Sequence, residues 1–441
     1  MSDRHDVIIV GGRPAGVGLA IRLARQGRRV LVLDRATFPS PPQVPSCPAL
    51  HMGTLALLDE LGVPEAVYAT GAQRFGDYVI RFGTWFDAPI RMPTVHGRAF
   101  GYYVDRSVFD AAMWEHLGPI PGVERRAGFR VDAVLREGDR VVGVEGQMAD
   151  GTLEAFHAPW VVGADGRFSS VARMVGAATV ETRDEKASTV YFADWKGVAP
   201  RYAGAPVEME VWTDGAGTDV LLFPLPGNRF TVATHQRADQ VDTGGDPEAY
   251  YRAQIRRYPW YTERFADADV TSRVIGVKKI GNGYREAAGK GWALLGDAFH
   301  YKDPVDAQGI YDALLGGRIL AEELGAALDG RQDAEVAGKR YGERARAATH
   351  PMFEATVQRL VTELYGPPPN LVVRTVIRWL LTDRTYQERF FRFIGRDPSV
   401  DPTRWRPPSL ILGAVARGLG RDVARFLGRS AKELPGPVAG R

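Results

Sequence analysis

The strongest constraint on the fold is a strand, a helix and a second strand that follow one another near the N-terminus. Residues 6–12 read Asp-Val-Ile-Ile-Val-Gly-Gly, a short apolar run without polar alternation, as expected of a parallel strand buried on both faces. Pro14 suits the first turn of a helix, and apolar residues recur at roughly helical spacing up to Gly27. Residues 29–34 supply a second buried strand, which ends in Asp34. This order predicts a βαβ unit and, with it, an α/β protein built on a parallel sheet.

The turn between the first strand and the helix has the composition of a dinucleotide-binding turn. Gly11 permits a tight turn, Gly16 permits close packing of helix and strand, and the free N–H groups at the helix start suit a pyrophosphate. Asp34 stands 18 residues after Gly16, where an acid that binds ribose hydroxyls is expected. Arg13 replaces the middle glycine of the usual pattern, and its side chain could contact the cofactor or point to solvent. A purely structural turn could use the same residues, but strand, helix and acid together favour dinucleotide binding.

Composition narrows the class of protein. The 441 residues are 45% hydrophobic with a net charge of +3, and we find no basic and aromatic recognition module, so nucleic acid binding is not expected. No run of 18 apolar residues occurs, so we expect no membrane span. The first strand begins within six residues of the start, so we expect no signal peptide and a cytoplasmic location. The single cysteine, Cys47, excludes an internal disulfide and is expected to be a packing residue.

Beyond the first unit the pattern alternates between helices and strands, and from about residue 329 it becomes helical. The expected elements are helices over 53–61 and 105–117, the second capped by Asp105, a hairpin over 78–91, strands with hairpin turns over 123–163, and an antiparallel sheet with one buried face over 207–234. The aromatic residues of this sheet region are expected to be core more often than pocket wall: Tyr191, Phe192, Trp195, Trp212 and Phe223.

Two further motifs complete a family resemblance. Residues 163–166 read Gly-Ala-Asp-Gly after a buried strand, and Gly296-Asp297 is followed by the segment 303–309, Asp-Pro-Val-Asp-Ala-Gln-Gly. With residues 11–16, and in this order, they resemble the FAD-dependent monooxygenases of the aromatic-hydroxylase type, the class A flavoproteins. Within that group the chain resembles a subgroup that is also similar to geranylgeranyl-reductase-like FAD-dependent oxidoreductases. The resemblance covers about residues 4–330.

This resemblance implies a Rossmann-like FAD-binding domain that is interleaved with an antiparallel-sheet substrate domain and followed by a helical C-terminal region. The expected boundaries are 1–75, 99–180 and 276–330 for the FAD-binding domain, 76–98 and 181–275 for the substrate-binding sheet domain, and 331–441 for the helical region.

The resemblance also implies roles for individual residues. Asp34 and Arg35 match the acid and base at the adenosine ribose, Arg106 matches the arginine near the pyrophosphate, and Asp297 matches the carboxylate that accepts hydrogen bonds from the flavin ribityl chain. Asp165 belongs to the motif that supports FAD and the transient nicotinamide cofactor, although a simple turn residue fits as well. The expected cofactors are non-covalent FAD and, as reductant, NADH or NADPH. The expected cofactor-binding residues are Gly11, Gly12, Arg13, Ala15, Gly16, Asp34, Arg35, Arg106, Val131, Asp165, Gly296, Asp297, Pro304, Gln308 and Gly309.

The segment from His300 to Gly309 is where the chemistry is expected. Gly309 begins a long helix, and in the resembling enzymes such a helix N-terminus faces the flavin ring and stabilises the charge of its reduced form. His300 and Asp306 are the candidate acid or base groups, and a solvated loop is an equally good interpretation of each. With Asp303 they lack the spacing of a metal site, so no metal is expected.

The function that the resemblance implies is a single-component monooxygenase. NAD(P)H would reduce the flavin, O2 would give a C4a-hydroperoxyflavin, and one oxygen atom would hydroxylate or epoxidise a small organic substrate, aromatic or polyketide-like. The nearest alternative is a carbon–carbon double-bond reductase of the geranylgeranyl-reductase type, and a further one is a non-catalytic lipid-binding protein with a flavin fold. Neither a Ser-His-Asp signature nor the tryptophan motif of flavin halogenases is evident.

The C-terminal segment 404–432 combines apolar residues with arginines at four-residue spacing. Such a basic amphipathic stretch can lie on an anionic membrane surface. Because four glycines weaken the helix in isolation, we expect instead that it docks its apolar side on the protein and leaves its arginines in water, with peripheral membrane contact as the less favoured alternative. The arginines are Arg417, Arg421, Arg425 and Arg429.

Overall fold

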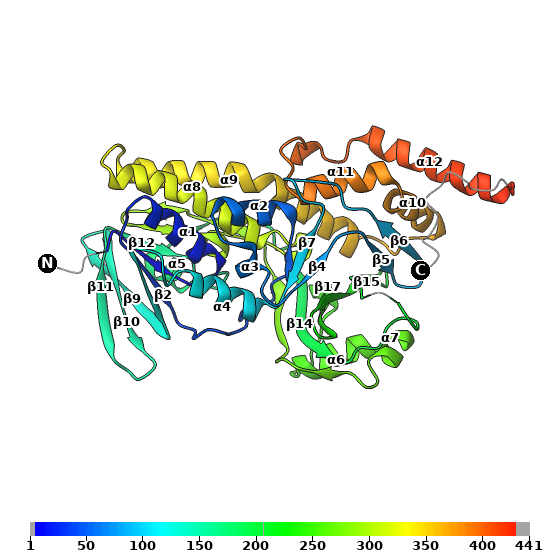
Figure 1. Cartoon of the computed structure of the whole chain (residues 1–441), viewed down its shortest axis with the longest axis horizontal. Helices are drawn as coiled ribbons and strands as arrows, with labels where there is room; N and C mark the ends of the chain where they lie inside the picture. Colours follow the sequence, from blue (N-terminus) through cyan, green and yellow to red (C-terminus); the bar gives the residue numbers. More distant parts are fainter. Residues whose placement is uncertain (1–4, 206, 429–441) are drawn as a thin grey trace.

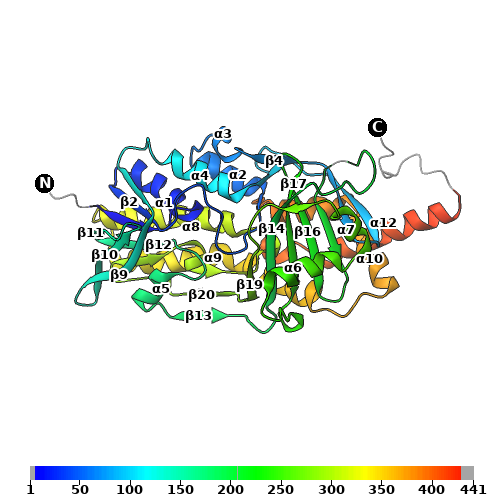
Figure 2. The ribbon, with the colours of Figure 1, turned by 90° about the horizontal axis from the view of Figure 1, so that it is seen from below.

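The computed structural model describes residues 5–205 and 207–428, which form an elongated molecule (Figure 1). A parallel sheet lies towards one end and a large antiparallel sheet towards the other, and α8 (Gly309–Leu328) and α9 (Ala334–Arg359) run side by side along the first of these parts. Helices that follow α9 in the chain gather at the far end (Figure 2). The predicted fold class, α/β with an antiparallel sheet and a helical C-terminal region, is confirmed.

The parallel sheet contains the predicted βαβ unit. Its strand order is β21-β22-β12-β1-β2-β8, and β1 (Val7–Val10) pairs in parallel with both β2 (Val30–Asp34) and β12 (Trp160–Gly163). Every residue of these three strands is buried, which explains their apolar sequences without alternation. Between β1 and β2, α1 (Pro14–Arg25) packs against α8. The remaining strands are β8 (Val123–Ala127), β22 (Trp292–Leu294) and β21 (Ala288–Gly289), which alone runs antiparallel.

Smaller sheets and helices surround this sheet. The predicted hairpin turns at Gly138 and Gly151 are present, with φ of 62° and 86°, conformations that glycine adopts readily. The cap at Asp105 is present too, because its carboxylate accepts a hydrogen bond of 3.1 Å from the Ser107 N–H. These elements are β9 (Phe129–Glu137), β10 (Arg140–Met148), β11 (Leu153–His157), β3 (Ala49–Leu50), β4 (Ala72–Phe75), β7 (Gly101–Val104), β13 (Thr179–Thr182), β20 (Gly283–Arg285), β23 (His300–Tyr301), α2 (Met52–Glu60), α3 (Glu65–Tyr68), α4 (Arg106–His116) and α5 (Ser170–Val175).

The antiparallel sheet has the order β18-β14-β17-β16-β15-β5-β6, with β19 also paired to β14. Since β19 ends at Ile280, this sheet extends beyond the expected boundary at residue 275. Its strands are β5 (Tyr78–Phe82), β6 (Phe86–Ile90), β14 (Ser188–Lys196), β15 (Glu210–Thr213), β16 (Thr218–Leu225), β17 (Arg229–Arg237), β18 (Asp269–Val270) and β19 (Ile275–Ile280).

The two faces of this sheet have different partners. On one face Tyr191, Trp195 and Trp212 form a core with residues of α6 (Pro247–Arg256) and α7 (Pro259–Arg264). On the other face Phe192 and Phe223 belong to a second cluster that includes residues of β4, β6, β7 and α11 (Arg384–Ile394). The prediction that these aromatics are core therefore holds for all five, although they belong to two different clusters.

The C-terminal helices correct one expectation. α12 (Pro408–Phe426) packs against α10 (Leu371–Leu381) and α11, but the residues it buries are Ala414 and Gly418, not its large apolar ones. The helix docks as expected, but the expectation that its apolar side meets the protein is wrong, because Leu412 and Leu419 are exposed and Arg417 forms an ion pair with Asp383. Arg417 and Arg425 are 48% and 54% exposed, and Arg429 lies outside the described residues. No helix of the described residues is long and apolar enough to cross a membrane.

Candidate functional site

A groove of about 780 Å³ runs from the ends of β1 and β2 to the start of α8. One wall is the segment 35–48, which contains five prolines and neither helix nor strand, and which we call the proline-rich wall. The groove brings together residues from all the predicted motifs: Gly11, Arg13, Ala15, Asp34, Arg35, Arg106, Val131, Asp165, Gly296, Asp297, His300, Pro304 and Gly309. Four predicted residues lie outside its lining: Gly12, Gly16, Asp306 and Gln308.

The turn after β1 is shaped for close approach. Gly11 has φ of 115°, and a Cβ added there would overlap the Ala164 carbonyl oxygen. A Cβ at Gly16 would overlap the carbonyl oxygen of Gly11, so Gly16 packs behind the groove instead of lining it. The first turn of α1 carries no acidic residue and its N-cap makes no side-chain hydrogen bond. The positive end of this helix is therefore available to a pyrophosphate.

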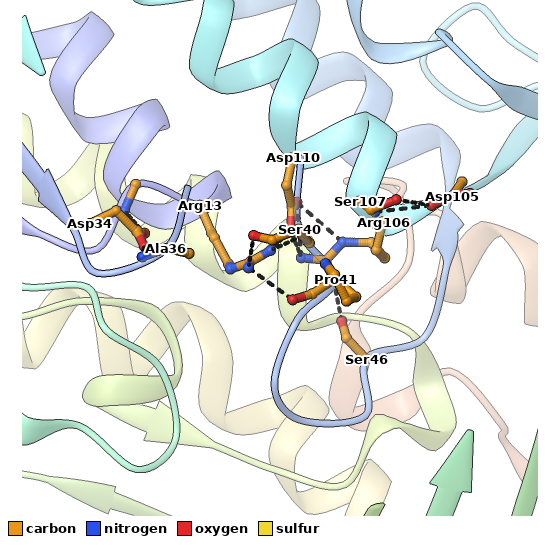
Figure 3. A network of polar contacts seen from close by, with 11 residues as sticks. Arg13, Asp34, Ala36, Ser40, Pro41, Ser46, Asp105, Arg106, Ser107 and Asp110 are labelled. Atoms are coloured by element: carbon orange, nitrogen blue, oxygen red, sulfur yellow. Dashed lines mark hydrogen bonds and ion pairs between the residues drawn. The ribbon is translucent and has the colours of Figure 1, made fainter. Parts of the chain in front are cut away.

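Arg13 turns away from the helix axis and holds the proline-rich wall (Figure 3). Its guanidinium donates hydrogen bonds to the Ser40 carbonyl oxygen at 3.3 Å, to Ser40 Oγ at 3.2 Å and to the Pro41 carbonyl oxygen at 3.0 Å. The same group pairs with Asp110 of α4, whose side chain is fully buried. The side chain therefore does not point to open solvent: it fixes a wall of the groove that it also lines, and its contact with the cofactor stays a prediction.

Arg106 shares the carboxylate of Asp110 with Arg13 (Figure 3). Its Nη2 donates to the two carboxylate oxygens at 3.0 and 3.1 Å, and its Nη1 donates to Ser46 Oγ in the proline-rich wall. Two guanidinium groups against one carboxylate leave one net positive charge beside the turn that follows β1. This excess suits the negative charge of a pyrophosphate.

Asp34 lies at the end of β2, where the sequence placed a ribose-binding acid. Its Oδ2 accepts a hydrogen bond of 2.7 Å from the Gly12 N–H, and its Oδ1 accepts one of 2.8 Å from the Ala36 N–H. These bonds hold the carboxylate at the groove edge, and each oxygen retains acceptor capacity for hydroxyl groups. Arg35 also lines the groove and donates to Gln43 in the proline-rich wall.

Asp165 has a structural task in the turn after β12. Its Oδ1 accepts from Ser169 Oγ at 2.5 Å, and its Oδ2 accepts from the N–H groups of Ser170 and Val171 at 2.7 and 3.1 Å. The carboxylate therefore satisfies the first turn of α5. It lines the groove, but most of its acceptor capacity is used within the chain.

Asp297 lies in the groove between two arginines that sequence reasoning did not single out for this role. Arg167 Nη2 is 3.8 Å from Asp297 Oδ2, and the same guanidinium donates to the carbonyl oxygens of Gly281 and Lys302. Arg285 donates to the carbonyl oxygens of Asp297 and Ala298. Arg167 lies in the turn between β12 and α5 and Arg285 ends β20, so both shape the Gly-Asp turn from outside its own segment.

The start of α8 is surrounded by buried charged groups. Lys302 Nζ is 2.6 Å from Asp312 Oδ2 in the first turn of the helix, and Arg396 Nη2 is 2.9 Å from Asp312 Oδ1. Burial opposes ionisation of Asp312, but these two cations outweigh it and lower its pKa. The cations thus compensate the acid, which would otherwise oppose the binding of a negatively charged group at this helix N-terminus.

The two candidate acid or base groups are placed differently. His300 lines the groove, stacks on Tyr284 with ring centroids 4.4 Å apart, and has a buried Nε2 without a hydrogen-bond partner among the described residues. Burial lowers its pKa to about 3, so it is neutral. Asp306 lies outside the lining, because it pairs with Arg359 and accepts a hydrogen bond of 2.5 Å from Thr356 Oγ1.

Gln308, which the sequence predicted to bind the cofactor, lies outside the groove lining. Its side chain donates to the carbonyl oxygens of Asp306 and Ile394, both at 3.1 Å, and accepts from Arg396 Nε at 2.8 Å. This residue therefore links the start of α8 to the end of α11 and does not line the groove.

A buried pair joins the groove to the antiparallel sheet. His235 of β17 places Nε2 3.2 Å from Asp303 Oδ1 and Nδ1 3.6 Å from Asp219 Oδ2, and Ser188 donates to the same Asp303 carboxylate. Burial opposes protonation of His235, but the two carboxylates outweigh it and raise its pKa to about 10. His235 is therefore a cation at neutral pH, and it keeps Asp303 ionised.

At its α8 end the groove meets the second cluster of the antiparallel sheet. Cys47, Val277 and Ala307 line the groove and also pack against this cluster. Burial raises the pKa of Cys47 to about 12, so it is a thiol and not a nucleophile. We call this set of buried side chains the apolar cluster: Met52, Phe75, Tyr103, Phe192, Phe223 and Phe391.

One group of possible metal ligands occurs among the described residues, and it lies outside the groove. Glu181, His350 and Glu354 have ligand atoms within 4.8 Å of one another. Arg346 and Arg183 pair with Glu181, so the charge of its carboxylate is already compensated.

Comparison with known proteins agrees with this geometry. A model of the FAD binding domain family matches residues 4–356. The chain is 28% identical to ubiquinone hydroxylase UbiL of Rhodospirillum rubrum over 333 residues, which cover 73% of this chain and 72% of that protein. It is 28% identical to menaquinone reductase of Mycobacterium tuberculosis over 357 residues, or 78% of this chain and 82% of that one. Among solved structures, flavin-dependent brominase Bmp2 superposes with a TM-score of 0.75 at 18% identity, covering 95% of this chain and all of that chain.

Proposed function

Because the chain belongs to the FAD binding domain family, in which its relatives are oxidoreductases, we propose that it is a single-component monooxygenase. It uses NADH or NADPH and O2 to hydroxylate or epoxidise a small, uncharged organic substrate of aromatic or polyketide-like structure. The observation that carries the proposal is the contact between the α8 end of the groove and the apolar cluster.

The groove fits FAD by the chemistry of its residues. The start of α1 and the net positive charge around Asp110 suit the pyrophosphate, and Asp34 suits the adenosine ribose. Asp297 would hold the ribityl hydroxyls, and the unpartnered His300 Nε2 offers a hydrogen-bonding group to the flavin end. When bound, FAD supplies hydride acceptance from the nicotinamide and the activation of O2.

The apolar cluster packs behind Cys47, Val277 and Ala307, so the α8 end of the groove has an apolar backing that suits an apolar substrate. Phe75 and Tyr103 stack with ring centroids 4.2 Å apart, and Tyr103 Oη donates only to Met209 Sδ, at 3.3 Å. An aromatic backing of this kind would favour a planar, apolar substrate at the α8 end of the groove. His51 adds a polar group at the edge: burial lowers its pKa to about 4, so its neutral ring offers hydrogen bonds without charge.

A double-bond reductase remains the second candidate, because menaquinone reductase resembles the chain as closely as the hydroxylase does. Both activities oxidise NAD(P)H, so the decisive measurement is oxygen uptake in the presence of substrate. With the FAD-loaded protein and a panel of quinones, phenols and polyketide aromatics, the monooxygenase consumes one O2 per hydroxylated product. Substrate reduction that consumes no O2 in air and also proceeds under anaerobic conditions would support the reductase. Failure to oxidise NAD(P)H would support a non-catalytic flavin-fold protein.

A further inference from the structure

α12 presents an apolar stripe to the outside of the molecule. Leu412, Leu419, Val423 and Phe426 have exposed fractions of 69%, 52%, 47% and 90%. Their spacing of seven, four and three residues places them on one face of the helix. Large apolar side chains that are exposed singly need no explanation, but a continuous stripe on one helix marks an interaction surface.

The opposite face of α12 is attached to α10 and α11. These contacts leave the apolar stripe exposed. Gly418 packs against the Trp379 ring, and a Cβ at this position would overlap it. Arg417 donates to Asp383 at 2.7 and 2.9 Å, where Asp383 is the N-cap of α11. Asp422 accepts a hydrogen bond of 2.8 Å from Trp379 Nε1. These contacts fix the rotation of the helix and direct its leucines away from the protein.

α10 adds apolar residues at the same end. Asp422 of α12 also pairs with Arg378 of α10, while Arg417 lies beside Asp383, which follows α10. The two helices are therefore antiparallel, and the exposed residues at the start of α10 lie near the end of α12. Figures 1 and 2 show α12 extending beyond the body of the molecule. We call these side chains the α10–α12 face: Leu371, Val372, Val373, Leu412, Leu419, Val423, Phe426 and Leu427.

The charge around this face indicates its partner. α10 and α12 together contain five arginines and one carboxylate, Asp422, and Asp383 beside Arg417 reduces their net charge from +4 to +3. Arg425, 54% exposed, and Arg417, 48% exposed, lie on the same helix as the stripe. A second copy of the chain would bring two such positive regions together, because a twofold interface opposes a surface to itself. An anionic lipid surface instead offers acyl chains for the apolar side chains and negative headgroups for the arginines.

We propose that the α10–α12 face binds the surface of an anionic lipid bilayer, with α12 lying in the plane of the interface. Arginines of the helical region contact lipid headgroups, and the leucines and Phe426 enter the boundary with the acyl chains. This inference does not depend on the proposed function, because no residue of the face lines the groove.

The test is co-sedimentation of the full-length, FAD-loaded protein with vesicles. Vesicles of phosphatidylcholine and phosphatidylglycerol should retain the wild type, added salt should weaken binding, and pure phosphatidylcholine should retain much less. The double variant Leu419→Ser/Phe426→Ser should bind the mixed vesicles at least about tenfold more weakly. The control is Leu153→Ser, which removes an equally exposed leucine, 76% exposed, from β11 in the other part of the molecule and should bind as the wild type does.

Four outcomes would overturn the proposal. The first is absence of wild-type binding to the mixed vesicles, the second is binding that is the same with and without phosphatidylglycerol, and the third is an equal loss in Leu153→Ser. The fourth is a dimer of the wild type, seen by light scattering, that the double variant dissociates, because the face would then be the interface between two copies. FAD content and NAD(P)H oxidation report that the double variant is folded, since neither residue is part of the groove.

Discussion

The network around Asp110 permits a quantitative test of how the groove is held together. Asp110 is fully buried and shares its carboxylate between Arg13, 22% exposed, and Arg106, 11% exposed. We consider the substitutions Arg13→Met and Arg106→Met, which remove the guanidinium groups but retain apolar stems. Each single substitution leaves the carboxylate with one cationic partner that still neutralises its charge. It should therefore lower the free energy of unfolding by only about 0.5–1.5 kcal/mol, the value of a typical hydrogen bond.

The double variant differs in kind from the two single ones. With both arginines removed, Asp110 is a buried charge without a cation, a condition that costs about 3–5 kcal/mol where one partner of a buried pair is lost. The loss in the double variant should therefore exceed the sum of the single losses by about 1–3 kcal/mol. In the background Asp110→Asn the excess should vanish, since no buried charge remains.

Urea unfolding without added FAD, followed by circular dichroism, gives the four free energies of the cycle. If the single losses add to the double loss within about 0.5 kcal/mol, Asp110 is not shared in the way that the structure shows, and the reasoning is refuted. An excess that persists in Asp110→Asn would also refute it, because the coupling would then arise from the proline-rich wall.

Three further outcomes follow from the groove. Asp297→Ala should weaken FAD binding by about 1.5–3 kcal/mol, roughly tenfold to a hundredfold, measured by titration calorimetry. The control is Asp139→Ala, which removes an exposed carboxylate. If Asp297→Ala and the wild type bind FAD equally well, Asp297 is not part of the site. Arg13→Gly should also weaken FAD binding, because the wall loses its anchor, but should leave the midpoint potential of the flavin unchanged; a shifted potential would show that the guanidinium reaches the flavin. Since the pKa of His235 rises from 6.5 to about 10 on folding, its contribution to stability is complete below pH 6.5 and is lost as pH rises towards 10. The difference in stability between wild type and His235→Gln should shrink over that range in denaturation at stepped pH, and a constant difference would contradict the charge assignment.

The sequence predicted well what depends on neighbouring residues. The βαβ unit, the hairpin turns at Gly138 and Gly151 and the cap at Asp105 all follow from local patterns, and all are present. Residues of the three motifs line one groove because each motif follows a strand of the same parallel sheet or begins a helix beside it. Such placement is the general property of an open α/β sheet.

Other features depend on partners distant in the chain. Asp306 appeared to be a free acid, but Thr356 and Arg359 of α9 occupy its carboxylate. The amphipathic pattern of α12 showed that one side is apolar, but not which side meets the protein. The ion pair between Arg417 and Asp383 determines which side of α12 faces the protein, and the spacing of residues within α12 does not predict this pair.

The buried pair of His235 and Asp303 has a mechanical meaning. It connects the strand β17, which belongs to the sheet behind the apolar cluster, with the segment that precedes the start of α8. Sliding one against the other would separate a buried cation from a buried anion, so we expect the sheet and the start of α8 to move together. The proline-rich wall has no such restraint from a strand ladder, and side chains such as Arg13 and Arg106 hold it. We therefore expect adaptation to molecules of different size to occur in this wall, while the distance between the start of α8 and the sheet stays the same.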